Sequence, residues 1–345
     1  MSLWVDKYRP QTLDKLTYHV ELSAHLKKLA SSGDFPHMLF YGPPGAGKKT
    51  RIVAVLRELY GPGVEKLKID QRTFVTPSNR KLDLNIVSSN YHLEINPSDV
   101  GIYDRIVVQD LIKEVAQTQQ VDANARHKFK VIVINEADQL TRDAQAGLRR
   151  TMEKYMGNLR LVLCCNSTNR IIGPIRSRCL LVRIAKPEHG EICDVLQHVA
   201  KRENFKLPSN LAKRIAELSD RNLRKALLML EAAKVQNQTL EEDQEIPLTD
   251  WEVFIQQIAR MIVEEQSPHR LLEVRTKLYE LVSHCISPEL VIKTLAFELI
   301  KLVDGELKGE IMLHAAFYEH RLRGGSKTVF HLEAFVAKVM SVYKS

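Results

Sequence analysis

The residues most informative about chemistry form a glycine-rich loop near the N-terminus: Gly42, Pro43, Pro44, Gly45, Ala46, Gly47, Lys48, Lys49 and Thr50. The loop follows a short apolar run and precedes a segment with helical periodicity, the order that a phosphate-binding loop requires. Glycines let the backbone turn tightly, so that N–H groups and a helix N-terminus face phosphate oxygens. We therefore predict that these residues bind a nucleotide, with Lys48 reaching the β- and γ-phosphates. A chance glycine-rich turn is the alternative.

One residue of the loop departs from the usual pattern. P-loop ATPases place Ser or Thr after the loop lysine, and its hydroxyl ligates Mg²⁺. This chain has Lys49 there, and an ammonium group cannot ligate a cation. Thr50 lies about 100° further round the helix, so it would replace the ligand only if the loop register shifted.

A second departure lies at the end of an apolar run, in Asn135-Glu136-Ala137-Asp138. In P-loop ATPases an acidic residue here positions Mg²⁺ and a neighbouring Glu orients water. Asn135 takes the acidic place, which leaves Glu136 as an inactive base. Two defects in one metal site predict a pocket that holds ATP or ADP without efficient hydrolysis. They also argue against Mg²⁺ in this pocket, and normal hydrolysis remains the alternative. We predict no other metal site.

The elements that position this loop read as an α/β fold with a parallel sheet of five strands. The expected strands are His37–Tyr41, Tyr91–Ile95, Val131–Ile134, Leu161–Cys165 and Leu180–Ile184. Residues 61–90 alternate apolar and polar side chains around Thr76-Pro77-Ser78-Asn79-Arg80. This pattern predicts a β-hairpin inserted between the first helix and the second strand.

After Pro187 the periodicity is helical throughout. Three helices are expected at Glu191–Arg202, Ser209–Ser219 and Arg221–Val235, the last capped by Ser219 or Asp220. An acidic stretch, 238–249, reads as a linker before a further helical region. We therefore expect three domains, at residues 1–186, 187–240 and 245–345.

Composition narrows the class of protein. The chain has 345 residues and a net charge of +8, unevenly spread. Residues 241–345 carry 12 Lys and Arg against 17 Asp and Glu, so residues 1–240 hold +13, which suggests a polyanionic partner for the front part. Five cysteines without C-x-x-C spacing argue against a disulfide framework or a zinc site. With no signal sequence and no membrane-length apolar run, we expect an intracellular protein.

A family resemblance rests on motifs along the whole chain. Residues 4–10 (Trp-Val-Asp-Lys-Tyr-Arg-Pro), the Gly-Pro-Pro-Gly loop, Asn-Glu-Ala-Asp and Ser177-Arg178-Cys179 stand in the order found in replication factor C small subunits, which the chain resembles end to end. The Gly-Lys-Lys-Thr loop and the segments 148–155 and 331–335 are similar to the members numbered 3 in one nomenclature and 5 in another.

The resemblance implies an AAA+ module, a three-helix lid and an all-α C-terminal collar that joins five subunits into a ring. It implies that this ring loads the clamp PCNA onto primer–template DNA in the nucleus, during replication and repair. Alternative large subunits are further possible partners. By position, the N-terminal segment would cover the adenine with Val5, Arg9 and Thr17. Asn166 matches a sensor of the γ-phosphate, and Arg224 matches the lid arginine.

Two further sets of residues follow from the resemblance. The resemblance implies that Arg178 is an arginine finger for the next subunit. The residues alone are equally consistent with an exposed arginine at a strand edge. Contacts with the DNA backbone would use cations on the helices after strands two and three. Gln109 stands where relatives often have a basic residue. The alternative is that these helix faces are simply solvated. These cations are Arg105, Lys113, Arg149, Arg150 and Lys154.

Two other functions remain open. One is an autonomous AAA+ DNA-dependent ATPase or motor, which Lys49 and Asn135 oppose. The other is a nucleotide-independent DNA-binding or scaffold protein with a vestigial loop.

Overall fold

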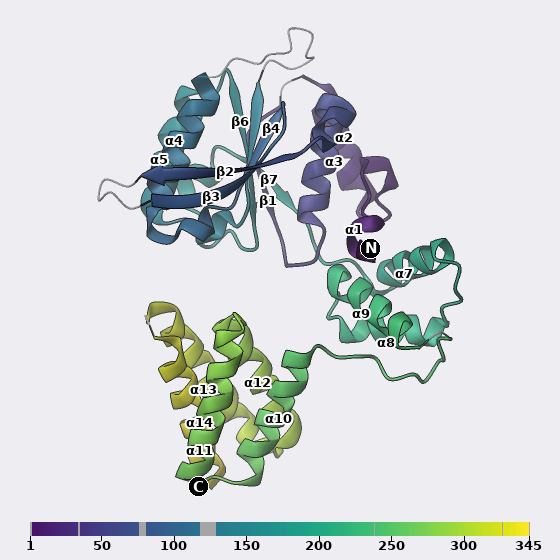
Figure 1. Ribbon diagram of the computed structural model, residues 1–345, viewed down its shortest axis with the longest axis vertical. Helices are drawn as coiled ribbons and strands as arrows, with labels where there is room; N and C mark the ends of the chain where they lie inside the picture. The colour runs from purple at the N-terminus through teal and green to yellow at the C-terminus, as the bar shows by residue number, and fades with distance from the viewer. Residues whose placement is uncertain are drawn as a thin grey trace. The chain divides into compact units, whose positions relative to one another are not determined.

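The computed structural model describes residues 2–33, 35–75, 81–117, 129–237, 239–325 and 327–344. The chain divides into two compact units, residues 1–246 and residues 247–345. Each unit has its own helices and its own apolar core (Figure 1), so each is described by itself.

The first unit is built on one β-sheet. Within the described residues its strands are β1 (Met38–Tyr41), β2 (Lys68–Val75), β3 (Lys81–Ser88), β4 (His92–Ile95), β5 (Lys130–Ile134), β6 (Leu159–Cys165) and β7 (Leu180–Arg183). Their order in the sheet is β2-β3-β4-β5-β6-β1-β7. Every neighbouring pair from β4 to β7 is parallel, whereas β2 and β3 pair antiparallel and β3 joins β4 antiparallel.

The expected parallel sheet is confirmed, but five strands is too few. The predicted hairpin forms as β2 and β3 and extends the same sheet, so the described part of the sheet has seven strands and is mixed. The reason is the pairing of Val87 and Ser88 with Glu94 and Leu93, which attaches the hairpin to the edge of β4. The predicted hairpin turn, residues 76–80, lies outside the described residues.

Helices cover both faces of this sheet (Figure 1). Beside the strands, the unit contains α1 (Trp4–Lys7), α2 (Val20–Ser31), α3 (Lys48–Tyr60), α4 (Asp104–Gln117), α5 (Arg142–Lys154) and α6 (Gly173–Arg176), with 3₁₀ turns η1 (Leu13–Lys15), η2 (Gly61–Glu65), η3 (Pro97–Tyr103) and η4 (Ala137–Gln139). Alternate residues of β5 face opposite ways. Ile132 and Ile134 pack in a cluster with α4 and α5, and Val131 and Val133 in another with α2 and α3. This alternation is expected for a strand buried on both faces.

Three more helices complete the first unit: α7 (His189–Arg202), α8 (Ser209–Leu218) and α9 (Leu223–Gln236). They confirm the three predicted helices to within about two residues. The predicted cap of α9 is wrong. Its N-cap is Asn222, whose side chain accepts a hydrogen bond from the Lys225 N–H at 3.2 Å. Asp220 and Arg221 both have positive φ, so the chain is still turning there and the helix cannot begin earlier.

The second unit is all-helical: α10 (Asp250–Glu264), α11 (Pro268–Ser283), α12 (Pro288–Leu302), α13 (Gly305–Gly324) and α14 (Thr328–Lys344). Ile255, Leu295 and Phe335 lie in its core, each fully buried or nearly so. In the described part of the chain, no helix is both long enough and apolar enough to cross a bilayer. Of the cysteines, Cys164, Cys165 and Cys179 are buried, whereas Cys285 is exposed, and none forms a disulfide.

Candidate nucleotide-binding site

The loop between β1 and α3 is held in a tight turn by its glycines. Gly42 passes so close to the end of β7 that an added Cβ would lie 1.9 Å from the Ile184 carbonyl oxygen. Gly47 has φ 84°, and an added Cβ would lie 2.2 Å from the Tyr18 hydroxyl. Only glycine fits either position. Residues 42–47 therefore fold closely over the start of α3, as the sequence predicts.

Lys48 is buried beneath this loop. Its ammonium donates to the carbonyl oxygens of Gly42 at 2.7 Å and Pro43 at 2.9 Å, and to Asn166 Oδ1 at 2.9 Å. Burial lowers the pKa of Lys48, because desolvation disfavours the charged form, while the nearby Cys164, Cys165 and Asp138 act in the opposite direction. The structure thus brings Lys48 and Asn166, 118 residues apart in sequence, into direct contact.

Lys49 has a partner that sequence reasoning missed. Its ammonium lies 2.8 Å from Glu94 Oε2. Glu94 sits in β4 and its side chain is only 8% exposed, so the pair neutralises a carboxylate that would otherwise be buried alone. An acidic residue inside an apolar strand was the available signal. Lys49, which stands in place of the metal-ligating hydroxyl, therefore forms an ion pair with Glu94 of the sheet.

The end of β5 carries the second departure. Asn135 is half-buried, and its N–H donates to the Ile95 carbonyl oxygen at 3.0 Å. Glu136 is exposed and has φ 49°. Asp138 is buried, and its Oδ2 accepts from the Asn166 N–H at 3.1 Å. This carboxylate, absent from the predicted site, fixes the strand end that presents Asn166.

These residues do not fit the Mg²⁺ coordination of P-loop ATPases. The hydroxyl and the strand-end carboxylate that would ligate the ion are replaced by an ammonium already bound to Glu94 and by a neutral amide. Among the described residues, no cluster of three or more His, Cys, Asp or Glu side chains could hold a metal ion elsewhere.

The predicted adenine and lid residues are only partly gathered at the loop. Gly45 lies against the Asn222 side chain, where an added Cβ would meet Oδ1 at 1.8 Å. This contact places the N-terminus of α9, and the exposed Arg224 two residues further on, beside the loop. Val5 lies on α1, which packs against α9. Arg9 pairs with Asp6 at 3.1 Å, and Thr17 is exposed.

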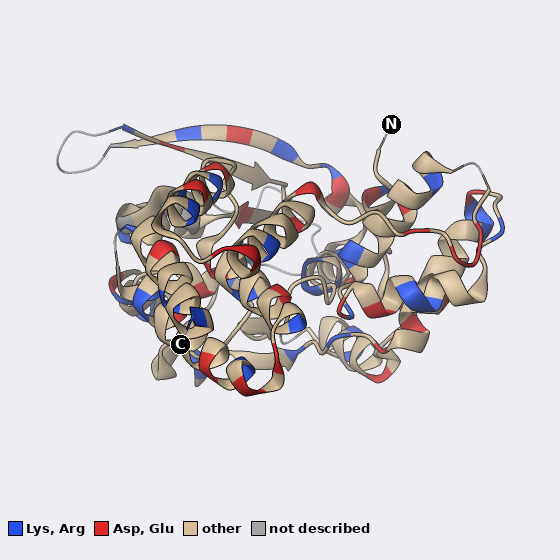
Figure 2. Ribbon diagram, turned by 90° about the horizontal axis from the view of Figure 1, so that it is seen from below, with Lys and Arg blue, Asp and Glu red and all other residues tan. Residues whose placement is uncertain are grey.

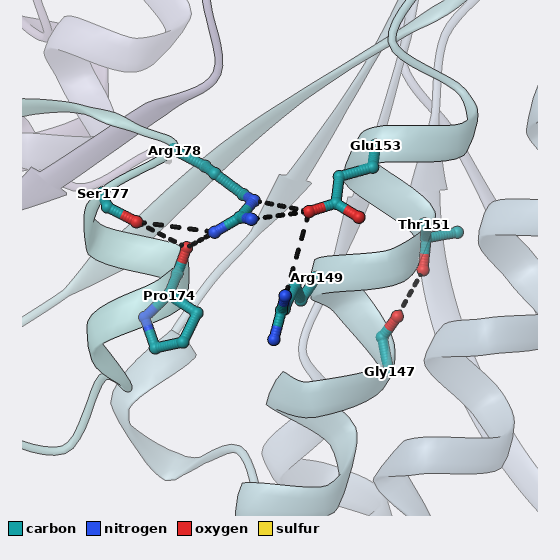
Figure 3. Close-up of polar contacts among 7 residues, drawn as sticks. All are labelled: Gly147, Arg149, Thr151, Glu153, Pro174, Ser177 and Arg178. Atoms are coloured by element: carbon teal, nitrogen blue, oxygen red, sulfur yellow. Dashed lines mark hydrogen bonds and ion pairs between the residues drawn. The ribbon is translucent and has the colours of Figure 1, made fainter.

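Arg178 follows α6 and reaches across to α5 (Figure 3). Its Nε and Nη2 lie 2.9 and 2.6 Å from Glu153 Oε1, and Nη1 donates to the Pro174 carbonyl oxygen at 2.8 Å. Arg149, one helical turn before Glu153, lies 3.8 Å from the same carboxylate oxygen. Glu153 thus stands between two guanidinium groups, one from each predicted functional set.

The predicted DNA contacts lie on α4 and α5, which pack side by side. Arg105, Lys113, Arg149, Arg150 and Lys154 are all exposed. Lys113 has a distant partner in Asp110, at 3.8 Å. Gln109 turns toward α5, where an added Cβ on Gly147 would lie 2.2 Å from its Nε2. Figure 2 shows Lys and Arg interleaved with Asp and Glu along the helices.

Protein-family profiles match three stretches of the chain. Residues 18–188 match the family described as DNA polymerase III, delta subunit. Residues 194–235 match the RCF1/5-like AAA+ ATPase lid domain, and residues 251–345 match the C-terminal domain of replication factor C subunit 3.

Similar proteins span the whole chain. Replication factor C subunit 5 of Neurospora crassa is 64% identical over 344 residues, covering 100% of this chain and 98% of the relative. Replication factor C subunit 3 of Homo sapiens is 59% identical, with 100% and 97% covered. Replication factor C subunit 3 of Arabidopsis thaliana is 50% identical, with 99% and 98% covered.

A likeness to a solved structure supports the fold alone. The RuvB Holliday junction branch migration motor of Thermotoga maritima superposes with a TM-score of 0.52 at 15% identity, covering 78% of this chain and 85% of that one. The shared architecture is the AAA+ P-loop fold.

Proposed function

The chain belongs to the family of replication factor C subunits numbered 3 or 5, and from this membership we propose that it is one subunit of a heteropentameric clamp loader. The loader places the PCNA sliding clamp onto primer–template DNA in the nucleus, during replication and repair. The observation that carries the proposal is identity of 50–64% along essentially the whole length of relatives from a fungus, an animal and a plant. Alternative loaders with a different large subunit are further assemblies open to it.

The pocket between β1 and α3 binds ATP or ADP without hydrolysing it efficiently. The loop residues 42–50 hold the phosphates, with Lys48 and Asn166 at their terminal end and Arg224 approaching from α9. Val5, Arg9 and Thr17 lie toward the adenine. The support is Lys49, whose ammonium replaces a metal-ligating hydroxyl and pairs with Glu94 at 2.8 Å, and Asn135, whose neutral amide replaces a negatively charged carboxylate. Without a well-held metal, Glu136 would orient water toward a poorly stabilised transition state.

Arg178 acts in trans, as an arginine finger in the pocket of the neighbouring subunit. A guanidinium from outside a pocket stabilises the charge that spreads over the transferring phosphoryl group. The side chain is about one third exposed, and its orientation is set by two anchors, Glu153 and the Pro174 carbonyl. The subunit is thus catalytic for its neighbour while idle in its own site.

The three parts of the chain divide this work. Residues 1–186 form the nucleotide-binding module, residues 187–240 the lid and residues 245–345 the collar that joins the ring. The DNA backbone is followed by the exposed cations of α4 and α5: Arg105, Lys113, Arg149, Arg150 and Lys154. Such contacts carry no base specificity and weaken steeply with salt.

Native mass spectrometry of the tagged chain with its copurifying partners tests this function. We expect a complex of five different subunits, with nucleotide retained on this chain. A chain that purifies as an independent oligomer without other replication factor C subunits would contradict the clamp-loader assignment.

A second measurement distinguishes the autonomous motor. We expect the purified chain alone to show almost no ATP turnover. Turnover at about 1 s⁻¹ or faster, an ordinary enzymatic rate, that is abolished by Lys48→Ala would instead support a self-sufficient ATPase.

A further inference from the structure

We propose that Arg51 is a built-in counter-cation of the nucleotide pocket, supplying from within the protein the positive charge that Mg²⁺ normally brings to a bound nucleoside di- or triphosphate. The proposal rests on the nucleotide binding proposed above and adds the group that makes this binding independent of metal. Arg51 is outside the loop pattern, three residues after Lys48 in the first turn of α3.

The burial of Arg51 is complete. Its relative exposure is 0%, and it is the largest of the fully buried side chains in the described part of the molecule. Nη2 donates to the Tyr18 carbonyl oxygen at 2.7 Å, and the guanidinium carbon lies 4.3 Å from the centroid of the Tyr18 ring. Both contacts are with a neutral residue, so neither cancels the charge.

The rest of the guanidinium is unsatisfied. Nε and Nη1 are buried and have no hydrogen-bond partner among the described residues. No described carboxylate stands in an ion pair with Arg51, whereas Lys49, two residues before it, is paired with Glu94. Buried charges in folded proteins are normally paired or bound to an ion, because desolvating an isolated charge is costly. Because Arg51 is inaccessible to solvent, its uncompensated charge would act on an anion bound to the loop through space, without a direct contact.

The position of Arg51 identifies where that anion would lie. Nη1 is 3.4 Å from the place that a Cβ on Gly47 would occupy. The Tyr18 hydroxyl donates to the Ala46 carbonyl oxygen at 3.0 Å, so the residue that Arg51 stacks on is tied to the same loop. The guanidinium thus lies next to Gly47, in the loop whose N–H groups would face a bound phosphate. In this low-dielectric position its charge is only weakly screened.

The two cations of the loop itself, Lys48 and Lys49, do not fill this role. The charge of Lys49 is cancelled by Glu94 at 2.8 Å. Lys48 is bound by three neutral oxygens and can contact the terminal phosphates, as it does in any P-loop protein. Arg51 is the additional charge in the described pocket that no acidic residue offsets, and it is present where the metal ligands have been lost.

The test measures binding of ADP and ATP to the purified full-length chain by calorimetry, in excess Mg²⁺ and in EDTA. We expect the wild-type affinity to agree within about twofold between the two conditions. Arg51→Met, which keeps the length of the side chain but removes its charge, should weaken binding about tenfold or more in both. Arg51→Lys should retain part of the affinity. Arg57→Met provides the matched control, because Arg57 lies on the same helix but is partly exposed and paired with Glu65.

Thermal unfolding separates a binding role from a structural one. If Arg51 serves the nucleotide, Arg51→Met without nucleotide should melt at or above the wild-type temperature, since an unpaired buried charge has been removed, and it should lose the shift caused by ADP. A lower melting temperature together with unchanged nucleotide affinity would show a purely structural Arg51 and overturn the proposal. If Arg51→Met does not fold, Arg51→Lys and the wild-type EDTA comparison carry the test.

The outcomes also separate this inference from the proposed function. Wild-type binding that requires Mg²⁺ would overturn the role of Arg51 and leave nucleotide binding intact. Absence of ADP and ATP binding in both conditions would overturn nucleotide binding itself.

Discussion

Glu153 is the residue that orients Arg178, the proposed arginine finger. Its Oε1 accepts from two nitrogens of Arg178 and lies 3.8 Å from Arg149. Both partners of the Glu153–Arg178 pair are substantially exposed, so the pair contributes only about 0–1 kcal/mol to folding stability. That small energy is still enough to favour one rotamer of a flexible side chain. Glu153 therefore orients Arg178 more than it stabilises the fold.

We expect Arg178→Ala to lower hydrolysis in the neighbouring pocket of the assembled ring by about 10³-fold or more, since arginine fingers contribute about 10³–10⁵ to kcat. Ring assembly should be unchanged. Glu153→Gln should lower kcat by a smaller factor, about threefold to tenfold for a contact of ~1 kcal/mol, and should add nothing once Arg178 is Ala. ATPase rates of rings carrying each variant and the double variant measure this.

Asp14→Asn is the matched control, because Asp14 forms an exposed ion pair with Lys27, remote from Arg178 in sequence. Unchanged turnover after Arg178→Ala would remove the finger. Additive effects of Glu153→Gln and Arg178→Ala would remove Glu153 as a positioning residue.

At the scale of elements, buried polar side chains fix where helices and strands meet. Asp104, at the start of α4, accepts from the Thr141 N–H at 2.7 Å and from the Thr141 hydroxyl at 2.9 Å. Thr141 is the N-cap of α5. These two hydrogen bonds set the spacing of α4 and α5, which carry the proposed DNA contacts. The Asp104 carboxylate of α4 accepts from an N–H at the N-terminus of α5 that has no partner within its own helix.

His37 makes a similar hydrogen-bonded link between two strands. It precedes β1, and its Nδ1 accepts from the Leu161 N–H of β6 at 2.9 Å. Burial, with a smaller contribution from the charge of Arg160, lowers the pKa of His37 from 6.5 to about 4. Between these two values the unfolded chain binds more protons than the folded one, so the stability of the sheet rises with pH and is lost as pH falls.

The expected cost of acidification is therefore up to about 3 kcal/mol of unfolding free energy between pH 6.5 and pH 4. His37→Gln, which keeps an acceptor but cannot titrate, should lose this part of the pH dependence. Urea unfolding of both proteins at a series of pH values measures it. His269→Gln serves as the control, since the His269 side chain is 84% exposed. Equal slopes for wild type and His37→Gln would contradict the assignment.

At the scale of the whole molecule, the positive excess lies in the first unit. Residues 247–345 carry 12 Lys and Arg against 13 Asp and Glu, so the second unit is close to neutral. The second unit exposes large apolar side chains on α12 and α13, among them Phe297 at 48%, Leu313 at 68% and Phe317 at 50%. Exposed apolar surface of this kind is typical of protein interfaces. It supports collar contacts with other subunits rather than with DNA.

A chain ending at residue 246 should accordingly keep its fold and its nucleotide affinity but fail to enter the ring. The physical reason is that residues 1–246 form a compact unit with their own core, while the proposed subunit contacts lie in the remainder. Co-purification with the other subunits measures incorporation. The complementary piece, residues 247–345, is the control and should still associate with its neighbours. Stoichiometric recovery of the shortened chain in the ring would show that the collar assignment is wrong.

The sequence alone determined the elements whose signals are local. Strand-length apolar runs and helical periods predicted the parallel sheet, the hairpin and the helices, and the loop 42–50 predicted its tight turn, because each pattern is set by neighbouring residues. It could not show that the hairpin joins the main sheet, since sheet order depends on pairing between distant strands. Nor could it place the α9 cap at Asn222, where two residues of positive φ delay the helix.

Only the tertiary structure decided which charges are paired. It pairs Lys49 with Glu94 and Arg178 with Glu153, in each case across two different elements. It leaves Arg51 with no acidic partner among the described residues. The energy of a charge depends on its burial and on what lies within a few ångströms. Both are properties of the folded chain, so no pattern along the sequence reveals them.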